Sequence, residues 1–129
     1  MGKKQQALIN DLAQTQTACD IEINKITTAV SGVVALNLKM SASNDHVLKA
    51  QLESQKNPHW GVILAARTQL KTRIPKFETS LKSLEAFAKE KAKRWVGKST
   101  LKDATTAISD AKAHLTNMKQ TVEASVVLL

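Results

Sequence analysis

Apolar side chains recur over the first forty residues at alternating steps of three and four positions. The positions of this first seam are Ile9, Leu12, Gln16, Cys19, Ile23, Ile26, Val30, Val33, Asn37 and Met40. This spacing is the period of an α-helix that buries one stripe of its surface. It predicts a helix over about residues 4–41, which at 1.5 Å per residue is about 55 Å long.

Two further seams with the same spacing follow. The second consists of Trp60, Ile63, Arg67, Leu70, Ile74, Phe77, Leu81, Leu84, Ala88, Lys91 and Trp95. The third consists of Leu101, Ala104, Ile108, Ala111, Leu115, Met118, Val122, Ser125 and Leu129. They predict helices over about 58–96 and 100–128, the first with Asn57 as its N-cap and Pro58 at its first position. Because the seam keeps its phase across Pro75, we expect a kink there and not a break.

The connections between these helices are short and polar. Val47, Leu48 and Leu52 predict a possible short helix at about 45–56, with a loop as the alternative. Gly97 is suited to end the second long helix, and Ser99 or Thr100 to cap the last one.

The expected fold class is all-α. With two prolines and four glycines in 129 residues, the chain has too few turn residues for a sheet protein. Three amphipathic helices must share a core, which predicts a single domain over 1–129, an elongated antiparallel bundle of three long helices. A four-helix arrangement, or a dimer in which the long seams pair between chains, is the alternative.

The sequence gives few signs of its compartment. The start of the chain has no signal-peptide apolar region, and the apolar stretch at 29–38 is too short to span a bilayer. We therefore expect a soluble protein, cytoplasmic or exported without a cleavable signal peptide. Cys19 is alone, so it forms no disulfide within the chain, and its place on the seam predicts a buried small side chain.

The positive charge is concentrated on one predicted helix. Residues 67–102 contain eleven Lys and Arg against three Glu, which accounts for the whole net charge of +8. One interpretation is a solvated helix face, because three Glu each precede a Lys or Arg by four positions, and the alternative is a surface that binds an anion. Four basic residues have few acidic neighbours on their helix face and are the candidates for binding an anion, either nucleic acid or an acidic membrane. They are Arg73, Lys76, Lys91 and Arg94.

No residue pattern predicts catalysis, a metal site or a cofactor. The three histidines, His46, His59 and His114, lie far apart in the sequence and lack the neighbours of a zinc site. Polar residues that interrupt the seams either fix the register and number of partners or reach solvent past the edge of the core. These residues are Gln16, Asn37, Arg67 and Lys91.

Trp95, Val96 and Gly97 lie between the second and third predicted long helices. This arrangement resembles the W-x-G turn of the small secreted helical-hairpin proteins of type VII secretion systems, over residues 58–129. The resemblance implies an exported helical hairpin. The chain departs from that family in having no tyrosine, which its export signal contains, and in carrying a long helix before the hairpin.

The predicted function is that of a non-enzymatic helical protein–protein interaction module, such as an adaptor, a chaperone-like protein or an assembly subunit. The partner is another protein or a second copy of the chain, and no small-molecule substrate is evident. Four consecutive apolar residues exceed what one helix stripe can bury. These four residues and one tryptophan are the candidates for contact with a protein partner: Val126, Val127, Leu128, Leu129 and Trp95.

Overall fold

Four α-helices make up the computed structural model, which describes residues 2–94 and 98–127 and the side chains of all these except 98–100 and 127. They are α1 (Lys3–Ser41), α2 (His46–Gln55), α3 (Asn57–Ala92) and α4 (Lys98–Val127). The described residues contain no strand. The predicted all-α bundle of three long helices is confirmed, and so is the short helix after the first one.

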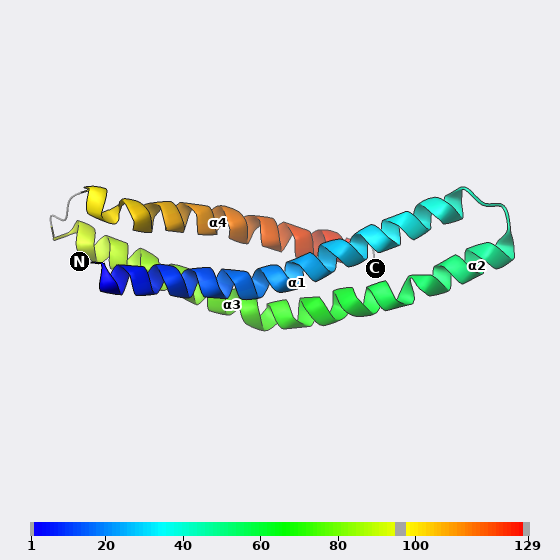
Figure 1. The fold of residues 1–129 in the computed structure, drawn as a ribbon, viewed down its shortest axis with the longest axis horizontal. Coiled ribbons are helices and arrows are strands. Elements are labelled where there is room, and N and C mark those ends of the chain that lie inside the picture. Colours follow the sequence, from blue (N-terminus) through cyan, green and yellow to red (C-terminus); the bar gives the residue numbers. More distant parts are fainter. Residues whose placement is uncertain (1, 95–97, 128–129) are drawn as a thin grey trace.

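The helices form an elongated up-down-up bundle (Figure 1). The α1 and α3 helices lie antiparallel along most of the length of the molecule, and α4 returns beside them in the direction of α1. No helix in the described part of the chain is long and apolar enough to cross a bilayer.

The junction between α2 and α3 differs from the prediction. Asn57 is not an N-cap, because it is the first residue of α3 and the helix has no side-chain cap. Lys56, the single residue between the helices, has helical dihedral angles (φ −72°, ψ −27°), and its carbonyl oxygen accepts a bond from the Trp60 amide. The backbone therefore passes from α2 to α3 with almost no change in conformation, and a cap is not needed.

The start of α2 is fixed by Asp45. One oxygen of its carboxylate accepts hydrogen bonds from the amides of Val47 (2.9 Å) and Leu48 (3.3 Å). These amides have no partner within the helix, so the cap satisfies them and favours a helix over a loop.

Pro75 lies inside α3 without breaking it. The ribbon of α3 changes direction near its middle, consistent with the kink that a proline imposes (Figure 1). At its other end α3 stops at Ala92, earlier than predicted. The predicted hairpin residues Trp95 and Gly97 lie outside the described residues, and α4 begins at Lys98, so Ser99 and Thr100 lie within the helix and do not precede it.

The main hydrophobic core is built from seven-residue repeats. Its fully buried members include Leu12, Cys19 and Ile26 of α1, Leu70, Phe77 and Leu84 of α3, and Ala104, Ala111 and Met118 of α4. Seven residues are about two helical turns, so each set lies on one side of its helix. The two alanines let the backbone of α4 approach the other helices closely. We call the part of the molecule around this core the body.

Beyond the body, α1 and α3 continue past the described end of α4. The buried members of the core cluster end at Ile26 in α1 and at Ala66 in α3, with the partly buried Val30 packed against them, and α2 makes no contact with the described part of α4. Residues 27–65, which we call the arm, form a two-helix extension (Figure 1). A smaller set of side chains is buried in the arm, separate from the core cluster: Ala29, Val33, Leu36, Leu52 and Ile63.

A buried charge tests the packing of the body. Ile26→Asp should lower the free energy of unfolding by more than about 3 kcal/mol, because it removes a fully buried side chain and leaves a carboxylate without a partner. Asn24→Asp, at an exposed position of the same helix, should change it by less than about 0.5 kcal/mol. Urea unfolding followed by circular dichroism measures both, and equal losses in the two variants would mean that α1 is not packed through Ile26.

Candidate functional site

A buried ion pair joins α1 to α3 at the centre of the body. The carboxylate of Glu22 is 3% exposed, and its Oε1 lies 3.3 Å from Nη1 of Arg73 and 3.3 Å from Nζ of Lys25. The same Nη1 of Arg73 donates to the carbonyl oxygen of Ala18 at 2.7 Å. The guanidinium thus satisfies a buried acid and a backbone acceptor, a structural role that holds the register of the two helices.

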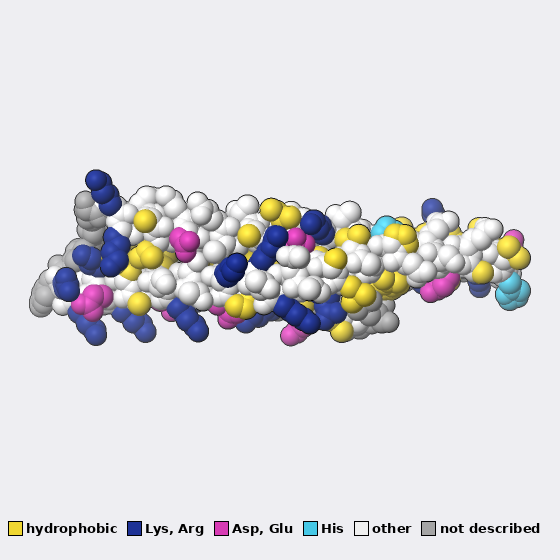
Figure 2. All heavy atoms as spheres, turned by 90° about the horizontal axis from the view of Figure 1, so that it is seen from below, with side chains coloured by type: hydrophobic (Ala, Val, Ile, Leu, Met, Phe, Trp, Pro, Cys, Tyr) yellow, Lys and Arg dark blue, Asp and Glu magenta, His cyan; other side chains and the backbone are white. Residues whose placement is uncertain are grey.

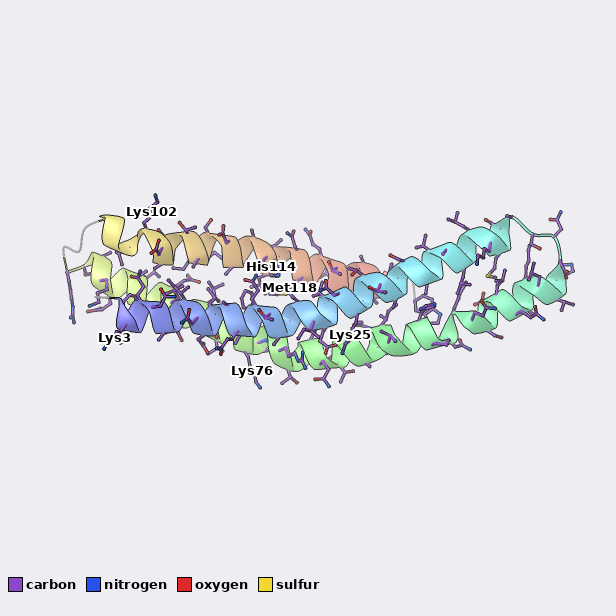
Figure 3. All side chains as sticks on the ribbon, in the orientation of Figure 1. Lys3, Lys25, Lys76, Lys102, His114 and Met118 are labelled. Carbon is purple, nitrogen blue, oxygen red and sulfur yellow. The ribbon has the colours of Figure 1, made fainter. Side chains whose placement is uncertain are left out.

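Two other polar contacts hold α1 against its neighbours. The hydroxyl of Ser80 on α3 donates to Oδ2 of Asp11 at 2.6 Å. His114 of α4, labelled in Figure 3, lies in hydrogen-bond contact with Asp20 through Nε2. Each contact joins residues far apart in the sequence, so together they fix how α1 is placed along both other helices.

The predicted anion-binding residues do not form one continuous row. Arg73 is engaged by Glu22, and Lys76 lies beside Pro75 in a separate shallow groove with Asp11. Lys91 and Arg94 lie fifteen or more residues further along the chain, at and just past the end of α3, which is at least about 22 Å on a helix. The structure therefore brings together Lys91 and Arg94 but separates them from Arg73 and Lys76.

Lys91 and Arg94 line a groove at the end of the body where α1 begins. Its volume is about 590 Å³, and it is also lined by Lys4, Phe87 and Glu90. The ammonium groups of Lys4 and Lys91 lie 6.0 Å and 5.7 Å from the centroid of the Phe87 ring. Glu90 forms an ion pair with Arg94 at 3.3 Å, so the groove is basic with one partly compensated charge.

The same end of the body gathers further cations. Lys3 of α1 and Lys102 of α4 lie at this end, as Figure 3 shows. Neither α1 nor α4 has an acidic residue in its first turn. Helix N-termini carry a partial positive charge, so the backbone reinforces the side chains there. We call this region the basic end.

The arm carries most of the exposed large hydrophobic side chains. Of the eight found among the described residues, six belong to it: Val34, Leu38, Val47, Leu48, Val62 and Leu64. Figure 2 shows Lys and Arg dense over the body and sparse over the arm on the face that it presents. An exposed region that is rich in apolar side chains and poor in charge is typical of a surface that another molecule covers.

Two of these side chains lie on the sides of α1 and α3 that α4 covers in the body. Asp20 meets α4 through His114, and Val34 lies fourteen residues, about four turns, further along α1. Glu78 meets α4 through Lys119 at 3.7 Å, and Leu64 lies fourteen residues before it on α3. Val34 is 45% exposed and Leu64 49% exposed, and the described part of α4 ends at Val127.

We call this side of the arm the arm face, defined by Val34, Leu38 and Leu64. Leu38, one turn beyond Val34, is 66% exposed at its edge. The arm face is the continuation of a groove that a third helix fills in the body. Its three defining side chains are apolar and exposed.

The apolar tail is described only in part. Val126 is exposed on the last turn of α4. The side chain of Val127, together with Leu128, Leu129 and Trp95, lies outside the described residues. The interaction role predicted for these five residues stays a prediction.

Sequence reasoning missed both the arm face and Glu22. Val34 and Leu64 stand off the predicted seams, where an apolar residue on a single helix is unremarkable. Glu22 stands beside the seam of α1, and its partner is on another helix. The sequence signal for this ion pair was Arg73, which lacks an acidic neighbour on its own helix face. An ionic partner for it could come only from another helix.

The histidines and the cysteine offer no metal site. Among the residues that the structure describes, no group of three His, Cys, Asp or Glu is placed to hold an ion. His59 packs its ring against Gly32, where an added Cβ would come within 2.5 Å of it. A larger residue at position 32 would therefore displace the His59 ring where α1 and α3 meet at the root of the arm.

Comparison with protein-family models, with curated proteins and with solved structures found no match to this chain.

Burial, and to a lesser extent the neighbouring Asp20 carboxylate, raises the pKa of the Cys19 thiol from 9.0 to about 11, while Arg73 opposes the shift. An acid whose pKa is raised by folding stabilises the protein below its unfolded pKa and loses that contribution as the pH rises. Between about pH 8 and about pH 11 the parent should therefore lose roughly 2 kcal/mol more of its unfolding free energy than Cys19→Ala does. Urea unfolding at the two pH values tests this, and equal losses would show that the thiol is not buried as described.

Proposed function

We propose that the chain is a non-enzymatic helical module that presents the arm face to another protein chain. The observation that carries the proposal is the arm itself, a two-helix extension with Val34, Leu38 and Leu64 exposed on the side that α4 covers in the body. Helix-in-groove binding uses apolar anchors spaced along such a surface. The body, held by the core cluster and the Glu22–Arg73 pair, serves as the rigid support.

A photo-crosslinking residue placed at Leu38 tests the proposal in cells that make the protein. Leu38 is the most exposed residue of the arm face, so covalent protein adducts should form there. The matched control is the same residue at Thr17, an exposed position on the body part of α1. Adducts should be several-fold more abundant at Leu38, measured by mass spectrometry of the purified chain. Equal or absent adducts at the two positions would contradict the proposal.

The basic end supports a second candidate function, the binding of a polyanion. Lys4, Lys91 and Arg94 converge on one groove from two helices, next to helix N-termini without acidic residues. Such a surface attracts nucleic acid or an acidic membrane through charge, without reading sequence.

Salt dependence tests this second function. If the three side chains contact phosphates, replacing Lys4, Lys91 and Arg94 by Gln should reduce the slope of log affinity for duplex DNA against log salt by about 2.7. The control replaces Lys39, Lys49 and Lys56 of the arm by Gln, which removes the same charge elsewhere. Fluorescence anisotropy with DNA, and flotation with anionic vesicles, measure binding. Equal effects of the two variants would show that only net charge acts.

A further inference from the structure

We propose that the arm face pairs with the arm face of a second copy of this chain, in an antiparallel four-helix arrangement that leaves the two bodies at opposite ends. The inference rests on the proposed function, because it names the partner that the arm face takes.

The geometry of the arm favours a two-helix partner. In the body, α4 closes the groove between α1 and α3 by placing Ala104, Ala111 and Met118 against their buried side chains. The arm has the same pair of helices and no third one among the described residues. Two such layers placed face to face make a four-helix bundle, in which each buries the other's exposed stripe. A twofold axis allows this pairing, because it matches a patch with itself.

The charge distribution favours a second copy over a charged partner. The arm contains Lys39, Lys49 and Lys56 against Asp45 and Glu53, which gives it a net charge of +1. The rest of the chain carries the remaining +7 of the total of +8. Two arms can therefore meet with little repulsion, whereas two bodies repel each other.

The same distribution sets the orientation. An antiparallel pair keeps the two basic bodies apart and places the tip of each arm over the root of the other. All five charged residues of the arm lie toward its tip: Lys39, Asp45, Lys49, Glu53 and Lys56. The root of the arm, residues 27–38 and 57–65, contains no Lys, Arg, Asp or Glu. Tip over root therefore places each tip, with its net charge of +1, against an uncharged root and not against the other tip.

The arm is large enough for a specific interface. Its longer side has about 20 residues, so it is about 30 Å long, and two helices side by side are about 20 Å wide. This gives about 600 Å² on each chain and about 1,200 Å² in total, at the lower limit of stable specific interfaces. We therefore expect a dimer that forms in the micromolar range of concentration.

Solution mass tests the pairing. The parent chain of 14.1 kDa should sediment as a dimer at concentrations above about 50 µM, given the size of the interface. The double variant Val34→Glu, Leu64→Glu should sediment as a monomer with an unchanged circular dichroism spectrum, because both side chains are exposed within one chain. The control Ile21→Glu changes an equally exposed side chain outside the arm and should stay dimeric. A monomeric parent, or a dimeric double variant, would overturn the proposal.

Disulfide trapping tests the orientation. Val34 lies midway along the α1 part of the arm, so an antiparallel pair places it near its own counterpart, while the two Val47 side chains at the tips lie far apart. Under mild oxidation Val34→Cys should form a covalent dimer, and Val47→Cys and the parent, with Cys19 buried, should not. Trapping through Val47 and not Val34 would overturn the antiparallel arrangement.

The crosslinking experiment at Leu38 separates this inference from the proposed function. Adducts of twice the chain mass support pairing with a second copy. Adducts only with a different protein leave the proposed function standing and overturn self-pairing. Absence of adducts beyond those at Thr17 overturns both.

Discussion

The difference in length between the helices governs the rest of this structure. The α1 helix has 39 residues and α3 has 36, extended by the 10 residues of α2, whereas α4 has 30. An amphipathic helix gains most of its stability by burying its apolar stripe, so each turn of α1 and α3 needs a neighbour. The α4 helix supplies one over the body only. The core cluster lies where α4 packs against α1 and α3, and the arm face is exposed outside it.

In the body, apolar packing supplies stability and polar contacts set the alignment of the helices. Seven-residue repeats of Leu, Ile, Phe and Ala supply the apolar burial, which is non-directional and allows helices to slide by a turn. The contacts Glu22–Arg73, Asp11–Ser80 and Asp20–His114 are directional and link specific residues. Sliding would remove Arg73 from the buried carboxylate of Glu22 and leave it only Lys25 of its own helix as an ionic partner. These contacts therefore fix one alignment of helices, and with it the length of the arm.

The sequence predicted the helices and the core closely, because periodicity reports directly which side of a helix is buried. It could not report how many neighbours cover that side at each turn. Val33 stands on one seam with Ile26 and Val30, yet it is buried outside the core cluster to which those two belong or pack. The anion-binding row of Arg73, Lys76, Lys91 and Arg94 was predicted from one helix alone. Arg73 is not available to such a row, because it forms an ion pair with Glu22 of α1. Asn57 was misassigned because a cap is needed only where the backbone turns, and Lys56 keeps it helical.

Hydrogen exchange of the backbone amides, measured at chain concentrations below and above the micromolar range, tests most directly whether the arm is an interface. Amides of the arm in α1 and α3 open locally in a two-helix structure and should exchange more slowly as the concentration rises, since a partner covers them. Amides of α4 between Leu101 and Ser125 should exchange at the same rate throughout. Arm amides whose exchange rate is independent of concentration would contradict the account.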